Sequence, residues 1–155
     1  MSTVLKRGIS ARAARAVVDA AIGRAEEMGI AVTAVVVDES AVVKALVRMD
    51  GCALLPVSVA QAKARTAVSI GMDTGGLYDG IAADPAMRSG LIAQPGVTLM
   101  GGGVVLRADG APIGAIGISG GTTEQDVDIA EAARAILQRT GDRQQGQRPS
   151  DTKDK

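Results

Sequence analysis

Three charged residues lie close together in the sequence and could bind or transform a small acid. Arg48 and Asp50 stand two residues apart at the end of an apolar run, and Lys63 follows one helix later. A guanidinium offers a planar fork that matches a carboxylate, and an ammonium adds a point charge. We therefore expect the three side chains to converge on one pocket that binds a small organic acid. The alternative is an Arg48–Asp50 or Lys63–Asp50 ion pair that only fixes a helix to a sheet.

A glycine-rich stretch supplies the second half of this candidate site. Residues 101–121 read GGGVVLRADGAPIGAIGISGG, in which Asp109-Gly110 is a two-residue hairpin turn between apolar runs. Glycines in and beside strands indicate a close approach to the backbone, either by a ligand or by a tightly packed helix. The expected ligand-binding set is therefore Arg48, Asp50, Lys63, Gly101, Gly102 and Ser119.

The sequence contains no histidine, which removes several kinds of chemistry. Ser-His-Asp and Cys-His catalysis, histidine-containing zinc sites and histidine-ligated haem are excluded. We expect no metal site. In an enzyme, Lys63 or Asp50 would be the acid–base group, and catalysis would need a shifted pKa at one of them. Burial on the alanine stripe could produce such a shift for Lys63.

The composition limits the partners of the chain. Its 155 residues carry 17 basic and 17 acidic side chains, so the basic surface expected of a nucleic-acid-binding or membrane-surface protein is missing. No apolar run is long enough to span a bilayer. Cys52 is the single cysteine, and Tyr78 is the single aromatic residue. These features predict a cytoplasmic protein that binds neither nucleic acid nor membranes.

The order of the expected elements indicates an α+β fold. They are a helix over 10–29, strands over 31–37 and 43–49, a helix over 58–69, an irregular segment over 72–97, three further strands and a helix that Thr123 caps. Ser58 and Gln61 have the spacing of a capping box for the second helix. Hairpins make the sheet largely antiparallel, with the terminal helices on one face and the central helix on the other. We expect one domain over residues 1–140 and a disordered polar tail over 141–155.

Lys63 interrupts a stripe of small residues on the central helix. Ala60, Ala64 and Ala67 share its helix face, because residues three and four apart lie on the same side. Either the lysine extends along the edge of this face to reach solvent, or it has a functional role.

Two ordered blocks of the sequence resemble the GlcG/HbpS-type family, also known as the haem-degrading-domain family. The first block is RMDGCALLPVSVAQAKARTA at 48–67, and the second is the glycine-rich stretch at 101–121. The first helix, the VVVD strand end at 35–38 and the final helix also fall where the family has them. The resemblance covers roughly residues 8–138.

The resemblance implies a profilin-like, PAS-like three-layer α/β/α sandwich with a five-stranded antiparallel sheet, commonly assembled into homo-oligomers. Some family members bind haem, and a related domain forms the C-terminal part of PduO proteins. The histidine ligand of haem-binding relatives has no counterpart here, so haem would have to be held by Met, Cys52, Tyr78 or Lys. Val104 replaces the family's proline after the glycine pair.

Three functions are compatible with these features. The first is a non-catalytic accessory protein that binds a small organic acid or, without a histidine ligand, haem. The second is a small cofactor-independent enzyme, a lyase, isomerase or hydrolase acting on a carboxylated metabolite, with Lys63 or Asp50 in the acid–base role. The third is a structural subunit whose surface serves assembly. We favour the accessory protein.

Overall fold

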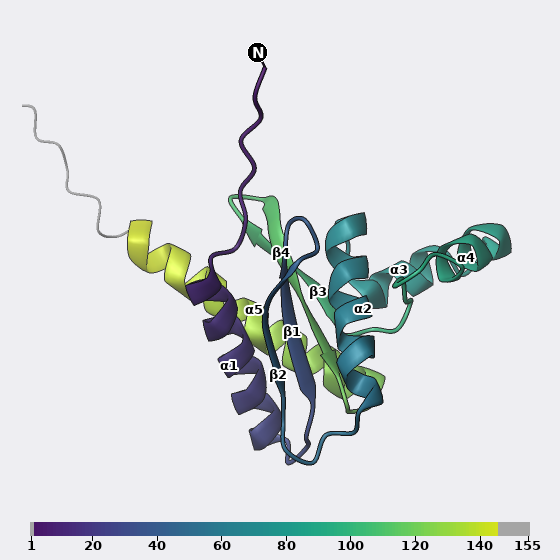
Figure 1. The fold of residues 1–155 in the computed structure, drawn as a ribbon, viewed down its shortest axis with the longest axis horizontal. Coiled ribbons are helices and arrows are strands. Elements are labelled where there is room, and N and C mark those ends of the chain that lie inside the picture. The colour runs from purple at the N-terminus through teal and green to yellow at the C-terminus, as the bar shows by residue number, and fades with distance from the viewer. Residues whose placement is uncertain (1, 146–155) are drawn as a thin grey trace, which may run out of the picture.

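The computed structural model describes residues 2–145 and confirms the α+β class (Figure 1). A single antiparallel sheet lies between helices. The elements in chain order are α1 (Ala11–Glu27), β1 (Thr33–Asp38), β2 (Val43–Arg48), α2 (Leu55–Ile70), α3 (Thr74–Gly80), α4 (Pro85–Ile92), β3 (Gly103–Ala108), β4 (Ala111–Ser119) and α5 (Thr123–Gln145).

The sheet has four strands in the order β2-β1-β4-β3, so the expected five-stranded sheet is wrong. No strand forms over residues 97–102, and the backbone N–H of Thr98 donates instead to Oγ1 of Thr66 on α2. Side chains also bond the backbone of the edge strand β3: Asp73 accepts from the N–H of Val105 and Thr74 from that of Gly103. Residues 73–74 therefore cover an edge that a fifth strand would otherwise pair.

Each face of the sheet has its own apolar core, as the helix order predicts. Helices α1 and α5 pack on one face, over buried side chains such as Val36, Ile116 and Ile118. Helix α2 packs on the other face, where Ala60, Ala64 and Ala67 meet Val35, Val37, Val105 and Ala115. The small residues on α2 let this helix approach the sheet closely.

Local signals set most element ends. Ser10 caps α1 by accepting from the N–H of Ala13, as predicted. The hairpin between β3 and β4 turns at Asp109 and Gly110, whose φ angles of 50° and 79° suit the predicted two-residue turn. The capping box expected at residues 58 and 61 is wrong, because α2 begins three residues earlier at Leu55 with a proline in its first turn.

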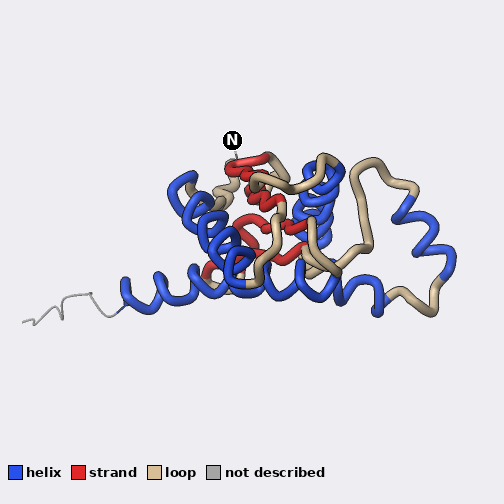
Figure 2. The backbone as a smooth tube through the Cα atoms, turned by 90° about the horizontal axis from the view of Figure 1, so that it is seen from below, coloured by secondary structure: helices blue, strands red, loops and turns tan. Residues whose placement is uncertain are grey.

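The segment that we expected to be irregular forms two short helices. In both views α3 and α4 extend away from the sheet beyond α2 (Figures 1 and 2). Helix α5 continues to Gln145, so the described part of the predicted disordered tail is helical, and residues 146–155 lie outside the described residues. Among the described helices, none is both long and apolar enough to span a membrane.

Candidate functional site

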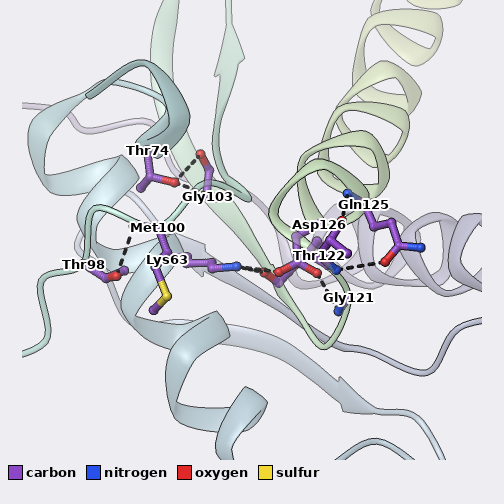
Figure 3. Close-up of polar contacts among 10 residues, drawn as sticks. Lys63, Thr74, Thr98, Met100, Gly103, Gly121, Thr122, Gln125 and Asp126 are labelled. Atoms are coloured by element: carbon purple, nitrogen blue, oxygen red, sulfur yellow. Dashed lines mark hydrogen bonds and ion pairs between the residues drawn. The ribbon is translucent and has the colours of Figure 1, made fainter. Parts of the chain in front are cut away.

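Lys63 lies inside the protein and joins the two faces of the sheet (Figure 3). Its Nζ donates to Oδ2 of Asp126 at 2.6 Å and to the carbonyl oxygen of Ile118 at 2.8 Å. Only 3% of the Lys63 side chain and 4% of the Asp126 side chain are exposed. The lysine therefore does not extend to solvent; it connects α2 to the first turn of α5 past the end of the sheet.

Asp126 is satisfied on both of its oxygens. Oδ1 accepts from the backbone N–H of Gly121 at 3.0 Å, while Oδ2 accepts from Lys63. Burial raises the pKa of the Asp126 carboxyl, and hydrogen bonding and charge from Lys63 oppose that rise. Just before this turn, Thr122 and Gln125 form a capping box with reciprocal side-chain bonds, so Thr122 rather than the predicted Thr123 caps α5.

The glycines of the 101–121 stretch make room for α2 and for this ion pair. Gly103 and Gly117 are register partners on the α2 face of the sheet. A Cβ on Gly117 would lie 2.0 Å from the carbonyl oxygen of Ala60, and a Cβ on Gly103 would lie 2.4 Å from that of Lys63. Of the two explanations for these glycines, the structure bears out the tightly packed helix at both positions.

Gly102 is held against the ion pair itself. Its φ of +106° lies in the region that favours glycine, and a Cβ there would lie 2.8 Å from Cβ of Asp126 and 3.2 Å from Nζ of Lys63. Ser119 is buried at the adjoining end of β4, next to the carbonyl that Lys63 contacts. Lys63, Gly101, Gly102 and Ser119 thus lie in one region around Asp126.

Arg48 and Asp50 do not join this group. The Arg48 guanidinium donates through Nε to the carbonyl of Cys52 at 2.9 Å and closes the turn after β2. Asp50 is exposed in that turn, and no hydrogen bond or ion pair between described residues links either side chain to Lys63. The Arg48–Asp50 and Lys63–Asp50 ion pairs that we considered are therefore wrong. Arg48 bonds the carbonyl of Cys52, and Lys63 pairs with Asp126. Whether the predicted residues contact a ligand stays a prediction.

Sequence reasoning missed the role of Asp126. It shares a helix face with Ile129, Ala130 and Ala133, all of which are buried. A carboxylate on an apolar stripe and a lysine on an alanine stripe are each costly to bury alone. Their complementary charges were the signal that could have predicted this pair.

A pocket of about 550 Å³ lies elsewhere, between the two short helices and the loop that precedes β3. Its lining includes Tyr78 of α3, Arg88 and Ile92 of α4, and Val97, Leu99 and Met100 of the loop. The volume lies in the usual range for small-molecule pockets. The lining is mainly apolar, with the three polar side chains of Tyr78, Arg88 and Thr98. The pocket is therefore a better-formed candidate binding site than the buried ion pair.

Hydrogen bonds to α2 and α3 fix the loop wall of this pocket. Thr66, one turn after Lys63, accepts from the N–H of Thr98 at 3.0 Å, and Thr98 accepts in turn from the N–H of Met100 at 3.2 Å. At the other end of the loop, Thr74 accepts from Gly103 at 2.9 Å (Figure 3). The loop between these anchors holds Met100, Gly101 and Gly102, so the pocket wall and the ion pair share one piece of backbone.

Arg88 gives the pocket its chemistry. Arg88 is half-buried, and its guanidinium forms no hydrogen bond or ion pair with any residue in the part of the chain that the structure describes. A cation in an apolar pocket attracts an anionic group on an otherwise apolar ligand, and guanidinium matches a carboxylate in shape. No group of three or more acidic, cysteine or histidine side chains within the described residues could hold a metal ion.

Comparison with known proteins places the chain in a family. The model of the family described as haem degrading protein HbpS-like matches residues 9–135. The chain belongs to the HbpS-like family. This confirms the resemblance to GlcG/HbpS-type proteins.

Individual relatives support the assignment to the HbpS-like family. Corrinoid adenosyltransferase PduO of Citrobacter freundii is 38% identical over 120 residues, which are 76% of this chain but only 36% of PduO. Protein GlcG of Escherichia coli K12 is 35% identical over 129 residues, covering 83% of this chain and 94% of GlcG. A crystal structure of a PduOC:haem complex superposes with a TM-score of 0.75 at 34% identity and covers 83% of this chain and 94% of PduOC.

Proposed function

We propose that this member of the HbpS-like family is a cytoplasmic accessory protein that binds an apolar ligand carrying a carboxylate. The ligand would occupy the pocket between α3, α4 and residues 97–100. The observation that carries the proposal is Arg88, a half-buried cation that lacks an acidic partner among the described residues in a mainly apolar lining. Apolar contacts would supply the affinity, and the guanidinium would orient the carboxylate.

Haem is one ligand of this chemical class, because it is a flat apolar ring with two carboxylates. A relative has been solved in complex with haem, and the side chains of this pocket suit the organic part of the group. Ile92, Leu99 and Met100 would contact the ring, and Arg88 would pair with a propionate. Bound haem would supply a redox-active iron, whereas the protein would bind, orient and shield it.

We propose that Lys63, Gly101, Gly102 and Ser119 contribute to this site indirectly, by holding the loop that forms one of its walls. Lys63 makes hydrogen bonds to Ile118 and Asp126 and is 3% exposed, so it offers no free ammonium and instead packs beside Gly102 of the pocket loop. Direct ligand contact by Arg48 and Asp50 would require a second subsite at the exposed turn after β2.

The alternative function, a small enzyme with Lys63 or Asp50 as acid–base group, gains no support from this geometry. An acid or base must come within hydrogen-bond reach of its substrate. Lys63 is enclosed between Asp126 and Ile118, and Asp50 stands exposed in a turn away from the pocket.

Titration with metal-free protoporphyrin IX tests the proposal, because this probe has the ring and the carboxylates but no iron. Arg88→Gln should weaken binding about tenfold or more, as expected when a charge-assisted hydrogen bond is lost. Arg12→Gln, which removes an exposed arginine on α1, should leave the affinity unchanged. The dimethyl ester of protoporphyrin should bind wild-type protein more weakly than the free acid. Absence of protoporphyrin binding, or equal affinity in the Arg88 and Arg12 variants, would contradict the proposal.

A further inference from the structure

We infer that Tyr78 is the residue through which this chain holds the iron of ferric haem, an inference that rests on the proposed function of the α3–α4 pocket. The sequence has no histidine, so the remaining side chains able to ligate haem iron are tyrosine, methionine, cysteine and lysine. The sequence alone does not choose among these four types. Their positions in the fold do.

Burial excludes Cys52 and Lys63 as ligands of haem iron. The Cys52 side chain is 3% exposed and its sulfur lies 3.5 Å from Oγ1 of Thr33 inside the protein. Lys63 is also 3% exposed, and both acceptors around its ammonium are protein atoms. Neither side chain can reach a ligand as large as a porphyrin without opening the core.

Two side chains able to ligate iron remain in the pocket itself. Tyr78 and Met100 line it from α3 and from the loop before β3, and their side chains are 47% and 49% exposed. The Tyr78 hydroxyl makes no hydrogen bond to any described residue, so its oxygen is available to a ligand. By contrast, the Met49 sulfur already accepts from the N–H of Val32, at 3.4 Å.

The chemistry of ferric iron favours the oxygen donor. A phenolate is a hard anionic ligand that neutralises charge on iron(III), whereas a thioether is soft and neutral. Tyr78 would therefore ligate ferric haem through its phenolate oxygen in exchange for a water molecule on the iron. The phenolic proton and the displaced water would pass to solvent, and the oxidation state of the iron would not change. Met100 would contact the ring as an apolar side chain.

Release of this proton gives the inference a signature that packing alone would not produce. Binding that requires deprotonation of a ligand becomes tighter as pH rises. Hemin should therefore bind more tightly with rising pH by more than metal-free protoporphyrin IX does, because both probes share the propionates and only hemin carries iron.

The test compares hemin with protoporphyrin IX in three proteins, followed by the Soret band and by fluorescence. In wild type, hemin should bind about tenfold or more tightly than protoporphyrin IX, which corresponds to about 1.4 kcal/mol for the iron–ligand contact. Tyr78→Phe should lose this difference and its pH dependence while keeping protoporphyrin affinity within about twofold. Met100→Leu, which removes the thioether from the pocket, should keep the difference between the two probes and its pH dependence, whatever the substitution does to the affinity that the probes share.

The results that would overturn the inference separate a wrong iron ligand from a wrong pocket. Unchanged hemin binding in Tyr78→Phe, or loss of the hemin preference in Met100→Leu instead, would show that Tyr78 is not the iron ligand while leaving the pocket intact. Failure of both probes to bind wild type would refute the proposed function, and the inference with it.

Discussion

Nζ of Lys63 and Oδ2 of Asp126 lie 2.6 Å apart and connect helices on opposite faces of the sheet. Each is a charged residue on a helix stripe whose other members are apolar and buried. Burying either charge without the other would be costly. Gly102 has no side chain to obstruct the contact, and Ile118 and Gly121 supply the remaining hydrogen bonds. The pair therefore fixes α2, β4 and α5 at the point where the pocket loop enters the sheet.

Replacement of Lys63 by methionine should destabilise the protein because it leaves the Asp126 carboxylate buried without a countercharge. Removal of one partner of a buried pair typically costs about 3–5 kcal/mol. Burial already raises the pKa of Asp126, and the lysine that opposes this rise would be gone. When the pKa of a carboxyl is raised in the folded state, the protein becomes less stable as pH rises through that pKa. The loss of stability in Lys63→Met relative to wild type should therefore be larger at about pH 7 than at about pH 4.

The double variant Lys63→Met/Asp126→Asn is the matched control for this effect. Asparagine keeps an oxygen that can accept from Gly121 but carries no charge to bury. Urea denaturation at the two pH values should show that the double variant recovers much of the stability at neutral pH and loses the pH-dependent deficit. A deficit in Lys63→Met that is the same at both pH values would contradict this account.

Gly117→Ala should be strongly destabilising, because the new Cβ would lie 2.0 Å from the carbonyl oxygen of Ala60 and would push α2 off the sheet. Overpacking of this kind costs about 3 kcal/mol at the upper end of its usual range. Gly23→Ala is the control. Apart from its chain neighbours and the backbone of its own helix, no atom lies within 4 Å of the added Cβ on α1, so helix propensity should yield a gain of about 0.5–1 kcal/mol. Thermal melts of both variants decide the point, and equal melting temperatures would count against helix packing as the reason for Gly117.

The sequence predicted the elements that depend on local patterns. The Ser10 cap, the Asp109-Gly110 turn, the three long helices and four of the five expected strands follow from short-range chemistry, and the structure confirms them. The fifth strand fails because the N–H of Thr98 bonds Thr66, and because Thr74 occupies the N–H of Gly103 at the edge of β3. The partners in these two bonds lie 32 and 29 residues apart along the chain. Such contacts leave no periodic pattern in the sequence.

In the candidate site, too, local patterns predicted some features, whereas long-range contacts set others that the sequence did not predict. The alanine stripe correctly identified Lys63 as unusual, and the glycine pattern correctly indicated a close approach at residues 101–103. The identity of the partner was wrong because Asp126 is 63 residues from Lys63, whereas the Asp50 that we considered is a neighbour in sequence. The pocket lined by Tyr78 and Arg88 depends on how two short helices turn back toward the loop, and sequence patterns do not encode that geometry.

The start of α2 presents an apolar surface that we expect to be buried in a homo-oligomer. The side chains of Leu54 and Leu55 are 77% and 71% exposed, and contiguous exposed apolar side chains commonly mark protein interfaces. Sedimentation at micromolar concentration should therefore show a species larger than the 15.6 kDa chain.

Leu54→Asn and Leu55→Asn together should dissociate this oligomer, because each substitution places a polar amide in the apolar contact. Leu5→Asn is the matched control, since its side chain is 99% exposed in the segment before α1 and belongs to no apolar cluster among the described residues. Light scattering should report a lower mass for the double variant only. A wild-type mass of 15.6 kDa would refute oligomerisation itself, whereas an unchanged oligomer in the double variant would place the interface on another surface.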